Sequence, residues 1–94
     1  MSETATRVAL VTGASRGIGR AIATRLAADG RHVVLAARSQ GPLDELKAEI
    51  ESSGGQATAL AIDVGDRDAF AGGIEGVVKD LGRLDVLVNN AGIT

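Results

Sequence analysis

Four short, continuously apolar runs alternate with three longer segments along the chain. A strand with one face in solvent alternates apolar and polar residues, whereas a strand buried on both faces is apolar throughout. The runs therefore predict strands of a parallel sheet, and the third is the weakest because Thr58 and three alanines lower its β-propensity. The predicted strands are Val8–Val11, Val33–Ala37, Ala57–Ile62 and Val86–Val88.

The segments between the runs repeat apolar residues at the three- and four-residue spacing of a helix. Gly30, Gly54 and Gly82 follow them and predict the helix ends. Pro42 suits the first turn of the second helix, and Asp66 suits the N-cap of the third. Three internal glycines weaken the third helix, at about 1 kcal/mol each relative to alanine. The apolar stripes are Ile18, Ile22 and Leu26, then Leu43, Leu46 and Ile50, then Phe70, Ile74, Val77, Val78 and Leu81.

The resulting order, β-α-β-α-β-α-β, predicts the α/β fold class. Strands that alternate with helices form a parallel sheet with right-handed crossovers. The links that follow the predicted helices are short, and no repeat or low-complexity linker interrupts the alternation. We expect one domain over residues 1–94.

Composition excludes several classes of function. The chain has 94 residues, 45% of them hydrophobic and 23% charged, which suits an ordinary protein core. The absence of cysteine excludes disulfides, thiol catalysis and cysteine-based zinc sites, and a single histidine, His32, excludes a histidine cluster for a metal. A net charge of −2 and one aromatic residue, Phe70, argue against nucleic acid as a partner.

The sequence also argues against a membrane partner. The first seven residues carry no basic cluster, and the first apolar run is too short for the core of a signal peptide. The longest apolar run, Val33–Ala37, is far below the ~20 residues that span a bilayer. We therefore expect a cytoplasmic protein.

A glycine-rich turn, T-G-A-S-R-G-I-G at positions 12–19, follows the first strand and opens the first helix. Free backbone N–H groups and the positive end of the helix dipole meet at such a turn, which favours phosphate. Its G-x-x-x-G-x-G spacing differs from G-x-G-x-x-G, and no Lys-Ser/Thr pair of a P-loop follows. The alternative is a turn that only packs. The candidate phosphate-binding residues are Gly13, Ala14, Ser15, Arg16, Gly17, Ile18 and Gly19.

The end of the second strand predicts the cofactor. In a dinucleotide fold, an acidic residue ~20 positions after the glycines binds the ribose and selects NAD, whereas an arginine accommodates the 2′-phosphate of NADP. Arg38 and Ser39 stand there, and no acidic residue precedes Asp44. Arg38 and Arg16 are expected to flank the phosphate, with Ser39 as a further donor. NADP is favoured; the alternative is that Arg38 is a solvated loop charge.

Two further polar segments follow the third and fourth strands, at the sheet edge where ligands bind in such folds. Asp63 and Val64 suit an adenine amino group and ring face, although Asp63 can instead cap the local backbone. The segment Asn89-Asn90-Ala91-Gly92 offers two amides and two small residues, although paired asparagines are also common in turns.

Together these signals resemble the amino-terminal half of the short-chain dehydrogenase/reductase family. Positions 12–19 match its T-G-x-x-x-G-x-G cofactor motif, positions 63–64 its adenine-contact pair, and positions 89–92 its N-N-A-G motif. The resemblance covers roughly residues 7 to 94. Within the family, the strings G-A-S-R-G-I-G-R and N-N-A-G-I-T look most like 3-oxoacyl-[acyl-carrier-protein] reductases.

The resemblance implies half of a Rossmann fold with strand order 3-2-1-4. It implies that residues 13–19 cradle the pyrophosphate and adenosine ribose, that Arg38 meets the 2′-phosphate, and that Asp63 and Val64 meet the adenine. Asn90, Ala91 and Gly92 would lie on the ribose side of NADPH, while Asn89 would tie neighbouring strands. The implied reaction is hydride transfer between NADPH and a carbonyl of the 3-oxoacyl thioester type, in fatty acid biosynthesis.

The chain departs from the family at its catalytic residues. The family uses a serine, a tyrosine and a lysine in a Tyr-x-x-x-Lys helix beyond the fourth strand, and this chain contains no tyrosine. Its only lysines, Lys47 and Lys79, lie in predicted helices that should face away from the site. No residue is assigned as catalytic, and we expect a fragment that is inactive alone. A non-catalytic nucleotide-binding module and a mere folding fragment are the alternatives.

The fourth strand is expected to form an edge of the sheet. Val86, Leu87 and Val88 are apolar, contain no proline, and are flanked by a single charged residue, Asp85. We therefore expect a homo-oligomer that forms through this strand.

Overall fold

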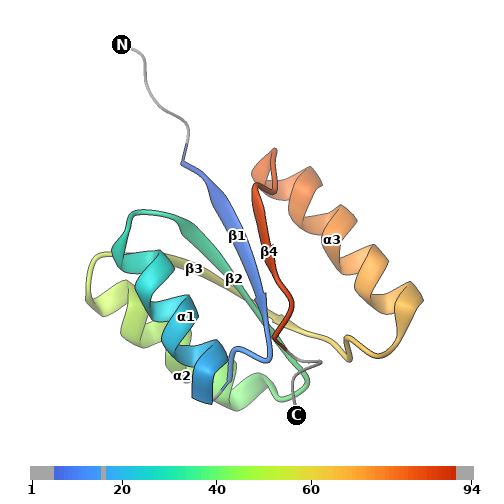
Figure 1. Ribbon diagram of the computed structural model, residues 1–94, viewed down its shortest axis with the longest axis horizontal. Helices are drawn as coiled ribbons and strands as arrows, with labels where there is room; N and C mark the ends of the chain where they lie inside the picture. The colour runs from blue at the N-terminus through green and yellow to red at the C-terminus, as the bar shows by residue number, and fades with distance from the viewer. Residues whose placement is uncertain (1–5, 16, 91–94) are drawn as a thin grey trace.

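The computed structural model describes residues 6–15 and 17–90, which form a four-stranded parallel sheet between two helical layers (Figure 1). The strand order is β3-β2-β1-β4, which confirms the predicted fold class and topology. The elements are β1 (Val8–Thr12), α1 (Gly17–Ala28), β2 (His32–Ala37), α2 (Gln40–Ser52), β3 (Gln56–Ala61), α3 (Arg67–Leu81) and β4 (Val86–Val88).

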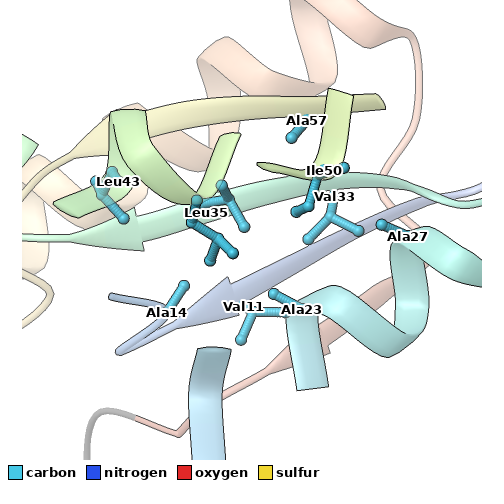
Figure 2. Packing of buried hydrophobic residues seen from close by; sticks show 10 residues of the cluster. Val11, Ala14, Ala23, Ala27, Val33, Leu35, Leu43, Ile50 and Ala57 are labelled. Carbon is cyan, nitrogen blue, oxygen red and sulfur yellow. The ribbon is translucent and has the colours of Figure 1, made fainter. Parts of the chain in front are cut away.

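Side chains of the central strands belong to two separate hydrophobic cores, one on each face of the sheet. Val11 of β1 and Leu35 of β2 pack under α1 and α2, where they meet Ile50 (Figure 2). Leu10 belongs instead to the cluster beneath α3, together with Val77. Because both faces of β1 and β2 are covered, their apolar runs are continuous, as the pattern predicts.

Burial on both faces was predicted for all four runs, and for the two edge strands this is wrong. In β3 only Ala57 is buried, and in β4 Leu87 is exposed. Each edge strand has a neighbour on one side only, so its side chains lack the flanking cover that β1 and β2 receive. An apolar run therefore does not distinguish an edge strand from a central one.

The helix signals place the ends within a few residues. The helix α2 begins at Gln40, two residues before Pro42, which still lies in the first turn. Asp66 caps α3 as predicted, since its side chain accepts a hydrogen bond from the backbone N–H of Ala69 at 3.1 Å. The internal glycines do not interrupt α3, which runs for 15 residues.

One of those glycines lets α3 approach the sheet. A Cβ atom added at Gly73 would lie 3.2 Å from Leu60 Cδ2 and 3.3 Å from Ile62 Cδ1. The helix therefore packs on this edge of the sheet more closely than alanine would comfortably allow. Within residues 6–15 and 17–90, no helix is both long and apolar enough to cross a membrane.

Candidate functional site

The predicted site residues gather at one edge of the sheet. All four strands are parallel, so their carboxyl ends meet at the same edge, the lower one in Figure 1. The amino terminus of α1 lies at this edge as well. The segments that follow the strands there are Gly13–Ser15, Arg38–Ser39, Asp63–Val64 and Asn89–Asn90.

The turn between β1 and α1 has the backbone of a glycine turn. Gly13 and Gly17 have φ angles of 63° and 61°, a region that side chains disfavour. Ala14 is fully buried in the core beneath α1 and α2, and its backbone N–H donates to the carbonyl of Ala36 at 3.2 Å. Its side chain and its N–H are thus used internally. Arg16 lies outside the described residues.

Gly19 marks the closest approach of α1 to the strand ends. A Cβ atom at this position would lie 2.1 Å from the carbonyl oxygen of Gly13 and 2.7 Å from Nδ2 of Asn90. The Asn90 amide also donates to that carbonyl oxygen in a long hydrogen bond of 3.5 Å. Only glycine fits here, so the amino terminus of α1 lies against the segments that follow β1 and β4.

Thr12 connects β1 to β4 beneath this turn. Its side chain is fully buried, and its hydroxyl oxygen accepts a hydrogen bond from the backbone N–H of Asn90 at 2.8 Å. The same oxygen lies 3.3 Å from the carbonyl of Val88 and 3.3 Å from Oδ1 of Asn89, both acceptors for its proton. Asn89 thus contacts the neighbouring strand, as expected.

Sequence reasoning gave Thr12 no role of its own, although a visible signal marks it. Among residues 6–15 and 17–90 it is the one polar residue buried in the core, and it ends an otherwise apolar strand. A buried hydroxyl needs hydrogen-bond partners, so its position predicts a structural connection.

Arg38 is exposed at the end of β2 and forms no ion pair with the residues described. Ser39 is the N-cap of α2, yet its side chain makes no capping hydrogen bond. A guanidinium, a hydroxyl and a helix amino terminus are therefore adjacent, and each favours an anion. The expected flanking by Arg16 falls outside the described residues.

Asp63 does cap its local backbone, which was the alternative interpretation. One carboxylate oxygen, Oδ1, accepts a hydrogen bond from the N–H of Gly65 at 2.8 Å, and its carbonyl accepts from Asp66 at 3.0 Å. The residue is exposed, and Val64 beside it is half-buried. The local bond uses Oδ1, and no hydrogen bond to Oδ2 is present among the described residues.

The last predicted cofactor residues, the two lysines and a possible metal site remain to be placed. Ala91 and Gly92 lie outside the described residues. Lys47 pairs with Glu51 along α2, with 3.8 Å between charged atoms, and Lys79 is exposed on α3. In the described part of the chain, no group of three or more histidines and carboxylates is placed to hold a metal.

This geometry defines a class of protein: an α/β domain in which a glycine turn, helix amino termini and polar loops meet at the carboxyl ends of the strands, where such folds bind nucleotides. The comparison with known families is specific. Residues 7–94 match the short chain dehydrogenase family, and the chain belongs to it.

Two relatives of equal sequence identity to this chain carry names that indicate different substrates. A fatty acyl-CoA reductase of Acinetobacter baylyi is 48% identical over 86 residues, which cover 92% of this chain and 29% of the relative. A 3-oxoacyl-[acyl-carrier-protein] reductase of Staphylococcus aureus is 48% identical over 90 residues, which cover 95% of this chain and 37% of the relative.

A solved structure agrees with the fold. A metagenomic short-chain oxidoreductase in complex with NADP superimposes with a TM-score of 0.84 and 48% sequence identity. The match covers 86% of this chain and 37% of that one. The chain thus spans roughly a third of the length of these relatives.

Proposed function

We propose that this chain is the NADP-binding part of an oxidoreductase that transfers hydride between NADPH and a carbonyl substrate. The observation that carries the proposal is the exposed Arg38 at the end of β2, which forms no ion pair with the residues described. It stands beside Ser39, whose hydroxyl makes no capping hydrogen bond. The bound cofactor would supply the hydride. The residues of this chain bind and orient it.

The pyrophosphate would lie over the turn between β1 and α1. Gly13 and Gly17 hold the turn with positive φ angles, and Gly19 brings the helix amino terminus against the strand ends. Backbone N–H groups and the helix dipole then favour the two negative charges. Because Ala14 is buried and its N–H is already bonded, the half-buried Ser15 and the exposed Gly17 and Ile18 are the remaining residues of the turn that can contact the pyrophosphate.

The 2′-phosphate would contact Arg38 and Ser39. A carboxylate at this point would repel the phosphate and bind the free ribose of NAD, yet the first acidic residue after β2 is Asp44, within α2. The Asp44 carboxylate already accepts from Nε2 of Gln40 at 2.7 Å. The local charge therefore favours NADP, as does the metagenomic relative whose structure holds it.

The remaining cofactor contacts follow the third and fourth strands. The Asp63 carboxylate, of which only Oδ1 is bonded within the described residues, suits the adenine amino group, and the half-buried Val64 offers an apolar surface to the ring. Asn90, held in place through Thr12 and Gly13, would contact the ribose side of the cofactor. These roles are inferred from the resemblance of the three segments to the family motifs.

A proton donor for the developing alkoxide is the missing element. Hydride transfer to a carbonyl needs one, and the chain contains no tyrosine. We expect the 94-residue chain to bind cofactor without reducing a substrate. The substrate class that we propose for the whole protein is a 3-oxoacyl thioester, with a cytoplasmic role in fatty acid biosynthesis; a non-catalytic nucleotide-binding module is the second candidate.

Titration calorimetry with NADPH and NADH tests the proposal. One charge-assisted contact contributes about 1.5–3 kcal/mol, so NADPH should bind at least about tenfold more tightly. Arg38→Asp should reverse that order. The matched control is Arg25→Asp, the same charge change at the far end of α1, which should leave the preference intact. Equal affinities for the two cofactors would contradict the proposal.

A second experiment distinguishes the two candidate functions. The 94-residue chain mixed with NADPH and a β-ketoacyl thioester should give no oxidation above background. Extending the reading frame downstream of Thr94 then distinguishes the candidates, because the oxidoreductase requires a Tyr-x-x-x-Lys segment there and the binding module does not.

A further inference from the structure

A groove lies between the carboxyl ends of α1 and α2, which pack side by side on one face of the sheet (Figure 1). Each helix runs back from the end of one strand to the start of the next, so the groove lies opposite the proposed nucleotide edge. It is lined from within residues 24–30 and 49–55, and β4 takes no part in it. Its volume is about 440 Å³, within the ~300–1,000 Å³ typical of small-molecule sites.

The floor of the groove is apolar. Ala27 of α1 and Ile50 of α2 line it and also belong to the core beneath the two helices. The turn after α2 passes close to both side chains, since a Cβ atom added at Gly55 would lie 2.8 Å from Ile50 Cγ2 and 3.5 Å from Ala27 Cβ. The floor is therefore packed and offers a hydrophobic surface to a ligand.

The backbone at the two helix ends is already hydrogen-bonded. The carbonyls of residues 25–27 in the last turn of α1 accept from the three N–H groups that follow that helix. The carbonyls of residues 49–51 in α2 accept in the same way from the three N–H groups after it. Unpaired carbonyls at a helix end favour a cation, and these have partners. Side chains therefore decide which charge the groove favours.

Arg31 lies at one end of the groove with a donor that has no partner. An adjoining hollow of about 160 Å³ shares Ala27 and Gly55 with the groove and is lined by Arg31. Nε of Arg31 is buried without a hydrogen bond, and it is the one such side-chain atom in residues 6–15 and 17–90. A buried donor without an acceptor is costly and rare. The side chain as a whole is 29% exposed, so part of it is open to a ligand.

The charges around the groove leave an excess of positive charge at Arg31. Asp29 contacts Arg31 with 3.8 Å between the charged atoms, and it is shared with Arg25 at 3.5 Å. Two guanidinium groups thus share one carboxylate, and the contact with Arg31 is longer than a hydrogen bond. Glu49 lines the groove as well, but Arg20 donates two hydrogen bonds to its carboxylate, at 2.5 and 2.6 Å. The charge that remains for a ligand is therefore positive.

We propose that this groove binds a small aliphatic carboxylate, with its charged end on the Arg31 guanidinium and its chain over Ala27 and Ile50. A guanidinium binds a carboxylate through parallel charge-assisted hydrogen bonds, which would supply acceptors to the Arg31 side chain. The apolar floor would bury the methylene groups of the chain. Because the groove and Arg38 lie at opposite edges of the sheet, the proposal does not rest on the proposed function.

Titration of octanoate into the isotopically labelled chain, followed by two-dimensional NMR, tests the proposal. The backbone signals of Gly54 and Gly55 should shift, with a dissociation constant of about 1 mM for a ligand of this size. Arg31→Gln should raise that constant about tenfold. The matched control is Arg25→Gln, which removes the other guanidinium on Asp29 but does not alter the lining of the groove. It should leave the constant within about twofold.

A second ligand and a second variant separate the charge from the apolar contact. Octanol has the same chain without the carboxylate and should bind about tenfold more weakly than octanoate. Ala28→Leu adds bulk to the lining of the groove and should weaken octanoate binding. The control for it is Ala21→Leu, the same change at an exposed position of α1 that does not line the groove, and it should have no effect.

Three results would overturn the proposal. They are the absence of shifts at the groove, equal weakening by Arg31→Gln and Arg25→Gln, and equal affinities for octanoate and octanol. Circular dichroism of each variant verifies that it is folded. NADPH affinity should be the same for Arg31→Gln and the unchanged chain, so failure of this proposal and failure of the proposed function are measured separately.

Discussion

The hydroxyl of Thr12 accepts a hydrogen bond from the backbone N–H of Asn90 at 2.8 Å, although the two residues are 78 positions apart in the chain. This bond fixes the loop after β4 against the end of β1. It is buried beneath the glycine turn, so the position of Asn90 depends on a residue that itself need not touch a ligand.

Replacing this hydroxyl by a methyl group should loosen the site and destabilise the fold. Thr12→Val keeps the side-chain shape but leaves the N–H of Asn90 without its acceptor, which costs about 1–3 kcal/mol. Urea denaturation should show that loss, and calorimetry should show weaker NADPH binding. The control is Thr24→Val, which removes an exposed hydroxyl bonded to its own helix at Arg20; it should change neither quantity appreciably.

Two glycine-to-alanine substitutions should change the free energy of unfolding in opposite directions. Gly19→Ala places a methyl group 2.1 Å from the Gly13 carbonyl, a backbone atom that cannot turn aside, and should destabilise the chain by about 3 kcal/mol. Gly76→Ala meets nothing within 4 Å in the middle of α3 and should stabilise it by about 0.5–1 kcal/mol. Thermal unfolding of both variants measures the difference, and a shared sign would contradict the described helix packing.

Lowering the pH should reduce the free energy of unfolding through protonation of His32. Burial lowers its pKa below 6.5, because the charged ring is poorly solvated there. Between 6.5 and the lowered folded value, the unfolded chain binds more protons than the folded one, so the free energy of unfolding falls as pH drops through this window. His32→Gln should remove this part of the pH dependence. An unchanged slope in that variant would assign the effect to another group.

A second acid transition should involve Asp85. The hydrogen bonds from Arg83, and then that from the backbone of Val8, lower the pKa of its carboxyl below 3.8. Its stabilising contribution is thus complete above 3.8 and is lost as pH falls through the lowered folded value. Asp85→Asn should reduce the stability lost in acid, whereas Asp80→Asn, at an exposed position of α3, should not. Denaturation curves at several acidic pH values measure both.

The sequence predicted the fold well because its signals are local. Continuous apolar runs, the capping Asp66 and the helix-ending glycines each act within a few residues, and the alternation of elements then restricts the topology. Burial at the sheet edges was mispredicted, because the exposure of Leu87 depends on which strand has no neighbour. A run of three apolar residues does not carry that information.

The site was predicted at the level of the sheet edge and not of individual atoms. Parallel strands bring their carboxyl ends together, so the loops at Arg38, Asp63 and Asn90 could be grouped from the sequence. The burial of Ala14 and the local cap of Asp63 depend on side-chain packing and loop geometry, which no motif spacing specifies. The inward turn of the Asp85 carboxylate was equally hidden, since Val8 lies 77 residues away.

The unequal covering of the two sheet faces has a consequence for folding. Beneath α1 and α2 the helices contribute Ala23, Ala27, Leu43, Leu46 and Ile50 as buried residues, whereas α3 contributes Val77 alone. The contacts from β1 through β3 also join segments that are near in sequence, while β4 must close a loop of most of the chain before it pairs. We therefore expect the first five elements to form the more cooperative unit, and α3 with β4 to dock last and open first. Amide hydrogens of α3 should exchange with solvent faster than those of α2, through sub-global openings that leave the central strands protected.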